Sequence, residues 1–265
     1  MGTSSTPDPL RGNAGDPGNL TDESFWDDFW QTIAIPARPD PALAFDRSFS
    51  RVLQRHLQPD PELSLVEIGC APGRWLVHCH ERFGYHVSGF EYSAAGLAKT
   101  QENLDATGVP ATVYAGDFMA ADLPLERFDV VLSLGFIEHF DDPLDVLRRH
   151  ALILKKGGLL FLEVPNLRGL NLKLLQWTHS PLLAVHNLAI MDPAVIEAMT
   201  KNLGLETIEI KYAGGYEPSF IDPAESSLWV RAGFGLCARV RRSFPLDNVN
   251  ARWISGYLYG VFRKR

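Results

Sequence analysis

The chain is poor in cysteine, in basic charge and in long apolar runs. Its 265 residues include only three cysteines, Cys70, Cys79 and Cys237, with no C-x-x-C pair. This small, odd number excludes a disulfide framework and favours a reducing, cytoplasmic setting. No apolar run reaches the roughly 18 residues of a membrane span, and no basic-then-apolar signal sequence opens the chain. The net charge of −7 argues against bulk attraction to nucleic acid or to an anionic membrane.

The hydrophobic content of 46% is sufficient for one domain with a sizeable core. We expect residues 1–20 to be a disordered tail, 21–57 a helical lid, and 58–265 the main domain. In the lid, Thr21 or Asp22 would cap a helix, and a second helix would span about 43–57. The first helix would carry aromatic residues on one face, which indicates either core packing or a cover over a ligand pocket. These residues are Phe25, Trp26, Phe29 and Trp30.

From residue 63 onward, apolar strand-like runs alternate with helical segments. We expect strands at 63–68, 85–90, 111–115, 129–134, 159–164, 205–212 and 255–262. Helices are expected at 73–83, 93–107, 142–154 and 192–203, with turns at Gly84, at 108–110 and at 156–158. This alternation predicts an α/β fold with a doubly wound, mostly parallel sheet.

Two irregular segments, 165–190 and 213–250, interrupt the alternation, and the second carries a predicted helix near 223–240. Both are too apolar for disorder, so we interpret them as a cap over a substrate pocket, in which selectivity would reside. The alternative is that the same apolar surface forms a homodimer interface. The side chains that we assign to the substrate are Trp30, Trp177, His179, His186 and Tyr216.

The segment V66-E-I-G-C-A-P-G-R-W75 joins a strand to a helix through a tight glycine turn. Glycine lets the backbone approach a ligand closely, and the helix N-terminus offers free N–H groups to an anionic part of it. This arrangement is typical of nucleotide-binding sites. The small Cys70 side chain is interpreted as filling space in the turn.

Three further features follow the next strands. Glu91 ends the second strand, where a carboxylate can accept hydrogen bonds from both ribose hydroxyls. Asp117 and Phe118 follow the third strand, where they could contact an adenine amino group and ring. The fourth strand runs through Leu134 and Gly135 into I-E-H-F. Because the carboxyl ends of parallel strands form one edge of the sheet, we expect all of these residues around one ligand.

This ordered set resembles the class I S-adenosylmethionine-dependent methyltransferases. The matching motifs are E-x-G-C-A-P-G, the strand-two acid, G-D-F, F-D-V-V, I-E-H-F and L-K-K-G-G, within residues 63–164. The resemblance implies a Rossmann-like seven-stranded sheet with an antiparallel last strand, and S-adenosyl-L-methionine as cofactor. It places the methionine part near the glycine turn, the ribose at Glu91 and the adenine at Asp117 and Phe118. The full set assigned to the cofactor is Glu67, Gly69, Cys70, Ala71, Gly73, Arg74, Glu91, Tyr92, Asp117, Phe118, Leu134 and Gly135.

Two departures from the family pattern stand out. Ala71 replaces the middle glycine, which is tolerable if its φ is negative, and Glu67 replaces the commoner aspartate while keeping the charge. A dinucleotide dehydrogenase, the main rival on this topology, would need G-x-G-x-x-G. That spacing is absent, since Gly69 and Gly73 lie four apart and Trp75 follows.

We therefore expect O- or C-methylation of a small molecule such as a sugar or a secondary metabolite. His139 is the candidate general base if the acceptor is a hydroxyl; the alternative is that Glu138 and His139 only cap the helix near Asp142 or orient a loop. No short ligand spacing indicates a metal. Methylation of a protein or RNA, and a non-catalytic cofactor-binding scaffold, remain as alternatives.

Overall fold

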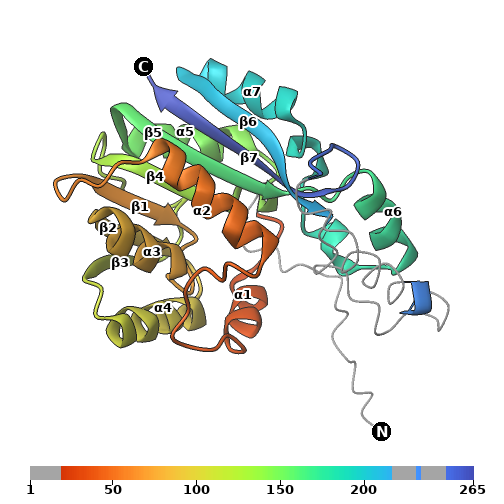
Figure 1. The fold of residues 1–265 in the computed structure, drawn as a ribbon, viewed down its shortest axis with the longest axis horizontal. Helices are drawn as coiled ribbons and strands as arrows, with labels where there is room; N and C mark the ends of the chain where they lie inside the picture. Colours follow the sequence, from red (N-terminus) through yellow and green to blue (C-terminus); the bar gives the residue numbers. More distant parts are fainter. Residues whose placement is uncertain (1–18, 217–230, 234–248) are drawn as a thin grey trace, which may run out of the picture.

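The computed structural model describes residues 19–216, 231–233 and 249–265. Its centre is a seven-stranded sheet in the order β3-β2-β1-β4-β5-β7-β6 (Figure 1). The strands β1 to β5 are parallel, and β7 runs antiparallel to both of its neighbours, β5 and β6. The strands are β1 (Ser64–Ile68), β2 (His86–Glu91), β3 (Ala111–Ala115), β4 (Phe128–Leu134), β5 (Leu154–Pro165), β6 (Leu205–Tyr216) and β7 (Ser255–Lys264). The predicted doubly wound, mostly parallel sheet is confirmed.

The fifth strand differs from its prediction. The turn expected at 156–158 lies inside β5, because the pairing with β4 jumps from Phe128–Leu154 to Val130–Leu159. The extra residues form an irregularity in which Gly157 has φ +79°. A left-handed backbone of this kind is readily adopted by glycine, so Gly157 accommodates the register shift within β5 instead of forming a turn before the strand.

The helices lie close to their predicted positions, and their ends follow local capping chemistry. Asp22 caps α1, Ser93 caps α4, Asp142 caps α5 and Asp192 caps α7, each through a side-chain oxygen that accepts a backbone N–H. The helices are α1 (Glu23–Trp30), α2 (Ala44–His56), α3 (Arg74–Phe83), α4 (Ala94–Thr107), α5 (Pro143–Ile153), α6 (Leu170–Trp177) and α7 (Pro193–Asn202). Asp142 caps α5 itself, so Glu138 and His139 are not its cap; they lie in a short 3-10 turn, η1 (Ile137–His139).

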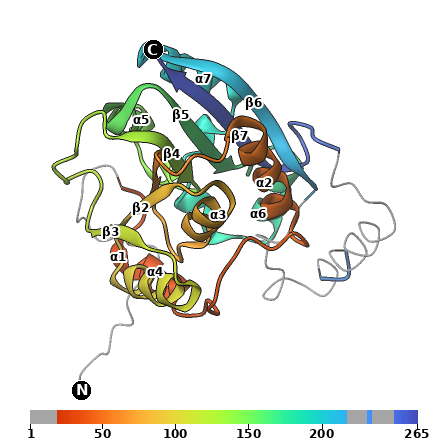
Figure 2. The same ribbon diagram turned by 60° about the vertical axis from the view of Figure 1, so that its left-hand side comes forward.

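Alternate side chains of the central strands enter two separate cores. Val130 and Leu132 of β4 pack with α2 and α3 on one face of the sheet, whereas Val131 packs with α5 on the other. Figures 1 and 2 show these helices covering opposite faces. Burial on both faces explains why the strands have nearly continuous apolar sequences.

The first irregular segment, 165–190, contains α6 and two short 3-10 turns, η2 (Pro181–Ala184) and η3 (Leu188–Ile190). Residues 213–216 of the second belong to β6, and its predicted helix lies outside the described residues apart from 231–233, which are helical. The predicted tail also lies outside them, except for Asn19 and Leu20. Among the described residues, no helix combines the length and the apolar character needed to cross a membrane.

Candidate functional site

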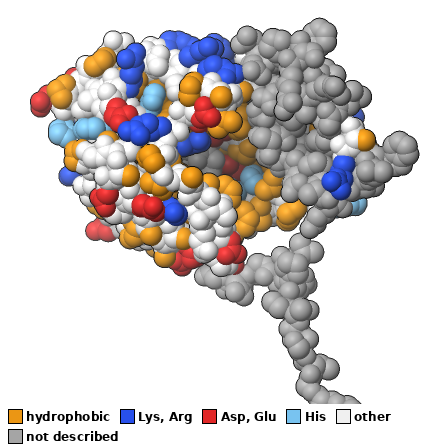
Figure 3. Space-filling model, turned by 60° about the horizontal axis from the view of Figure 1, so that its bottom comes forward, with side chains coloured by type: hydrophobic (Ala, Val, Ile, Leu, Met, Phe, Trp, Pro, Cys, Tyr) orange, Lys and Arg blue, Asp and Glu red, His pale blue; other side chains and the backbone are white. Residues whose placement is uncertain are grey.

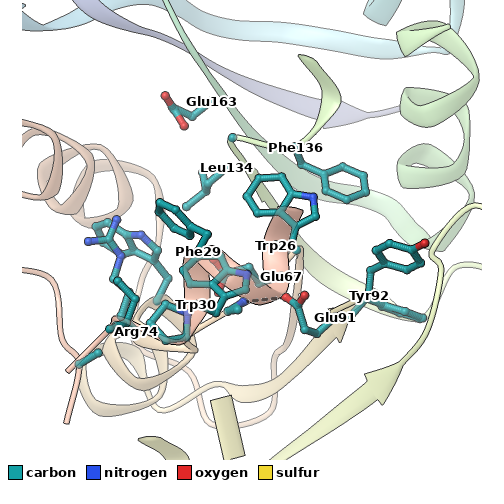
Figure 4. Close-up of a pocket in the computed structure, with 18 of the residues that line it drawn as sticks. Trp26, Phe29, Trp30, Glu67, Arg74, Glu91, Tyr92, Leu134, Phe136 and Glu163 are labelled. Atoms are coloured by element: carbon teal, nitrogen blue, oxygen red, sulfur yellow. Dashed lines mark hydrogen bonds between the residues drawn. The ribbon is translucent and has the colours of Figure 1, made fainter. Parts of the chain in front are cut away.

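A cavity of about 800 Å³ opens at the carboxyl ends of β1, β2 and β4. We call it the central cavity. Figure 3 shows a hollow on this side of the molecule with hydrophobic side chains around it, and Figure 4 shows side chains from α1 and from the strand ends pointing into it. Its walls include Trp26, Phe29, Trp30, Ile33, Arg38, Asp40, Phe45, Glu67, Gly69, Ala71, Arg74, Glu91, Tyr92, Asp117, Phe118, Leu134, Gly135, Phe136, His139, Phe140, Glu163 and Tyr257.

The glycine turn after β1 forms one wall of the central cavity. Gly69 has φ +69°, and a Cβ atom built there would lie 3.0 Å from Phe136 Cδ2. Glycine is therefore required both by the backbone conformation and by the close approach of the Phe136 ring. Ala71 is accommodated, since φ is positive only at Glu126 and His179 among the described non-glycine residues.

Glu91 connects this turn to the start of α4. One of its carboxylate oxygens accepts a hydrogen bond from Ala71 N at 3.0 Å, and the other accepts one from Ser93 N, also at 3.0 Å (Figure 4 shows the first). Burial raises the pKa of Glu91, and these backbone hydrogen bonds oppose the shift. Each carboxylate oxygen has a second lone pair, so Glu91 can still accept hydrogen bonds from a ligand in the cavity.

Two more buried carboxylates, Glu67 and Glu163, line the central cavity, and each has one oxygen without a hydrogen-bond partner among the described residues. Burial raises the pKa of Glu67 well above its usual value and that of Glu163 to about 8. The positive charge of Arg74 lowers the pKa of both carboxyl groups and so partly offsets the effect of burial. The Arg74 guanidinium also forms an ion pair with Asp46 at 3.0 Å. Unpaired buried carboxylates on a cavity wall fit a ligand that brings cationic groups or hydrogen-bond donors.

The remaining polar and aromatic residues predicted after the strands are also found on the cavity wall. Asp117 accepts a hydrogen bond from Met119 N at 2.8 Å, which fixes the turn after β3. Phe118 is buried and packs edge-on against Phe90. Tyr92, Leu134 and Gly135 complete the predicted residues that the cavity brings together.

The aromatic face of α1 covers the central cavity. Trp26 and Trp30 are stacked with ring centroids 6.2 Å apart, and Phe29 meets Trp30 edge-on at 4.7 Å. Figure 4 shows these three rings between Arg74 on one side and Phe136 and Tyr92 on the other. The helix therefore adds an aromatic wall opposite the polar ends of the strands.

His139 lies on the cavity wall, edge-on to Trp26 with ring centroids 5.0 Å apart. Its Nδ1 donates a hydrogen bond to the Val185 carbonyl at 2.8 Å. Burial lowers the pKa of His139 to about 3. The ring is consequently neutral at pH 7, with its lone pair on Nε2.

Several predicted site residues lie elsewhere. Cys70 points into the core, where its Sγ would lie 2.4 Å from a Cβ at Gly89, and Gly73 faces Thr100 as the N-cap of α3. In the first irregular segment, α6 turns Leu175 into the core, which leaves Trp177 57% exposed. His179 is exposed, Tyr216 is buried at the end of β6, and His186 packs against His139. Like Trp177, these three side chains do not line the central cavity.

The sequence interpretation missed other residues of the cavity wall. Glu163 carries a detectable signal, because an acid inside the apolar run 159–164 is costly to bury without a partner. Phe136, Phe140, Phe45 and Tyr257 carry none, since aromatic residues are equally at home in a core. They come from three separate segments, since Phe136 and Phe140 flank η1, and these segments meet only in the folded chain.

Comparison with known proteins agrees with this geometry. Residues 42–210 match a family model described as a methyltransferase domain. Ubiquinone biosynthesis O-methyltransferases are similar: that of Methylobacterium nodulans is 35% identical over 121 residues (45% of this chain, 47% of the relative), and that of Stutzerimonas stutzeri is 33% identical over 104 residues (38% and 44%). The chain spans about half the length of these curated relatives.

Solved structures share the fold. Phosphoethanolamine N-methyltransferase 2 of Haemonchus contortus, in complex with S-adenosyl-L-methionine, superposes with a TM-score of 0.57 at 18% identity, covering 82% of this chain and 51% of that one. Geranyl diphosphate C-methyltransferase of Streptomyces coelicolor gives 0.56 at 15% identity, covering 82% and 78%. The family match, the sheet order and the strand-end acids agree: the chain belongs to the class I S-adenosylmethionine-dependent methyltransferases.

Proposed function

We propose that this protein transfers the methyl group of S-adenosylmethionine to an oxygen atom of a small acceptor with an apolar or aromatic body. The observation that carries the proposal is the division of the central cavity into a wall of strand-end carboxylates and an aromatic wall from α1. The first suits a polar, partly cationic cofactor, and the second suits an apolar acceptor.

On the cofactor side, the bound S-adenosylmethionine supplies a methyl group on a cationic sulfur. In this proposal Glu91 accepts hydrogen bonds from the ribose hydroxyls, and Asp117 with Phe118 holds the adenine. The unpaired oxygens of Glu67 and Glu163 face the ammonium group, and Arg74 balances their charge. The glycine turn brings the backbone against the methionine part.

On the acceptor side, Trp26, Phe29 and Trp30 exclude water and orient the ring or chain that carries the reacting oxygen. The curated relatives are named as O-methyltransferases of ubiquinone biosynthesis, which supports oxygen as the accepting atom and an apolar acceptor. The cap proposed for residues 165–190 receives no support at Trp177 and His179, because both side chains are turned away from the cavity.

His139 holds the acceptor hydroxyl in this scheme. Its Nε2 can accept a hydrogen bond, since Nδ1 carries the proton that is donated to Val185. With a pKa of about 3, His139 is a weak base, so the general-base role expected from the sequence becomes an orienting role.

The test is the release of S-adenosylhomocysteine with a panel of phenols, catechols, sugars, a protein mixture and RNA. We expect turnover with a hydroxylated aromatic or polyprenyl-like acceptor. Trp26→Ala should raise the acceptor KM by about 10-fold or more, on the scale of losing a buried aromatic contact. The matched Trp177→Ala variant should leave it unchanged. Turnover only with protein or RNA, or no turnover despite tight cofactor binding, would contradict the proposal.

A further inference from the structure

Three potential ligand side chains meet beside the central cavity. Glu138 and His139 belong to η1, and His186 follows η2, far along the chain. One carboxylate oxygen and one ring nitrogen from each histidine lie within 4.8 Å of one another. The two imidazole centroids are 4.5 Å apart. We call these residues the Glu138 cluster.

Both histidine rings are oriented by backbone carbonyls. His139 Nδ1 lies 2.8 Å from the Val185 oxygen, and His186 Nδ1 lies 2.7 Å from the Leu182 oxygen. A carbonyl can only accept, so both Nδ1 atoms carry the proton and both Nε2 atoms present a lone pair. Metal-binding histidines usually make this hydrogen bond, which fixes the tautomer and the ring orientation.

The Glu138 carboxylate is 1% exposed, and its Oε2 has no hydrogen-bond partner among the described residues. The other carboxylate oxygen of Glu138, Oε1, lies 3.9 Å from His139 Nε2. With both rings protonated on Nδ1, neither faces the carboxylate with an N–H group. A cation at this position would satisfy the unpartnered oxygen of Glu138 and the two ring lone pairs together.

The backbone holds the two segments of the Glu138 cluster together. Asn187 N donates to the Glu138 carbonyl at 2.6 Å, and the Asn187 side chain donates to the Phe140 carbonyl at 3.1 Å. Leu20 N donates to the His139 carbonyl at 2.7 Å from a third segment. The cluster is therefore anchored on both sides and does not depend on one flexible side chain.

We propose that Glu138, His139 and His186 bind one divalent transition-metal ion, for which Zn²⁺ is the reference. Two imidazoles and one carboxylate form a donor set that zinc takes readily, with a fourth position left for water or a ligand oxygen. Mg²⁺ and Ca²⁺ prefer oxygen donors alone and are disfavoured. Tetrahedral zinc holds its ligand atoms about 3.4 Å apart, which small side-chain rotations from the observed spacing can reach.

The location gives the ion a role, and this step alone rests on the proposed function. His139 lines the central cavity, so an ion at its Nε2 would lie at the wall that faces the acceptor. A bound divalent ion would lower the pKa of a hydroxyl that it coordinates, so that the hydroxyl could release its proton to solvent water without a strong protein base. In the metal-bound protein the open coordination position of the ion, instead of His139 Nε2, would hold the acceptor hydroxyl.

The experiment measures metal binding directly. The full-length protein, stripped with EDTA and dialysed, is titrated with ZnCl₂ by calorimetry and with CoCl₂ by visible absorption. We expect one ion per chain and cobalt bands of a low-coordinate N/O site. Glu138→Gln and His186→Ala should each weaken binding by at least about 10-fold, the lower end of the effect of an outer-shell partner. His86→Ala, which removes an exposed histidine at the start of β2, is the matched control and should bind as wild type does.

Binding of S-adenosylhomocysteine shows that each variant is folded, and for His186→Ala it should change by less than about twofold, because His186 does not line the central cavity. Stripped wild-type protein that binds S-adenosylhomocysteine but takes up no ion would overturn the metal site. So would Glu138→Gln and His186→Ala proteins that bind zinc as tightly as the wild type. If zinc binds as expected but no acceptor is methylated, the metal site stands and the proposed function fails.

Discussion

The carboxylate of Asp27 in α1 accepts hydrogen bonds from Ser93 Oγ at 2.6 Å and from Ala95 N at 2.9 Å. Ser93 is itself the N-cap of α4 and lies two residues after Glu91, the last residue of β2. The hydrogen bonds from Ser93 and Ala95 lower the pKa of Asp27. The helix that carries the aromatic wall is therefore tied to the strand end that carries the ribose-binding candidate.

We predict that Asp27→Ala loosens α1 and weakens cofactor binding, because the helix loses its attachment to α4. Hydrogen exchange should become faster in α1 and stay unchanged in β1. Asp28→Ala removes the neighbouring exposed carboxylate and is the matched control. In the wild type, S-adenosylhomocysteine should slow exchange over residues 21–35 if this region acts as a lid. Equal exchange with and without ligand would leave only a packing role for α1.

Glu91→Ala should weaken the binding of S-adenosylhomocysteine by about 1–3 kcal/mol, the scale for charge-assisted hydrogen bonds. Part of this loss would come from the glycine turn, because Ala71 N and Ser93 N lose their acceptor. Calorimetry measures the affinity, and Glu62→Ala, at an exposed glutamate, is the control. An unchanged affinity would show that the adenosine lies elsewhere.

Gly69 and Gly108 form a matched pair, since both have φ +69° but only Gly69 has a close neighbour for an added Cβ. An alanine at either position should cost about 1–2 kcal/mol of folding free energy through backbone strain. Only Gly69→Ala should also impair binding of S-adenosylhomocysteine, and the larger Gly69→Val should abolish it. Thermal melts and calorimetry separate the two effects. Similar binding by Gly69→Ala and Gly108→Ala would exclude Gly69 from the site.

His150 is fully buried in α5, and burial lowers its pKa to about 4. The unfolded chain binds this proton at higher pH than the folded chain does. Stability contributed by the neutral ring is thus present above about pH 6.5 and lost as the pH falls through 4, by roughly 3 kcal/mol in total. His150→Gln should flatten this part of the stability curve relative to wild type, whereas His86→Gln should not. Denaturant unfolding from pH 7 to pH 4 tests this, and parallel wild-type and His150→Gln curves would refute it.

The fold was largely predictable because its signals are local. Apolar runs, glycine turns and caps such as Ser93 and Asp142 act over a few residues, so the sequence shows them directly. The carboxylates after the strands were predictable for a related reason: parallel topology brings strand ends together whatever the loops do. The positions of Glu91 and Asp117 beside the cavity follow from that rule.

The errors arise because an apolar residue in the sequence does not show whether its side chain points into the core, into the cavity or into solvent. Trp177 occurs in an apolar segment, yet α6 needs only Leu175 and its neighbours to bury a face, and Trp177 is left in solvent. The pairing of His139 with His186 depends on a loop returning to η1 through Asn187, which no spacing in the sequence indicates. Most of the second cap segment, residues 217–230 and 234–248, lies outside the described structure.

The position of β7 has a consequence for the order of assembly. It lies between β5 and β6, pairing Leu160 with Phe262 on one side and Tyr212 with Leu258 on the other. During synthesis β6 emerges first but has no strand to join until residues 255–264 have followed it. The sheet is therefore completed by insertion rather than by addition at an edge. Until then β5 presents an unpaired backbone edge, which is the kind of surface that chaperones protect and that aggregation exploits.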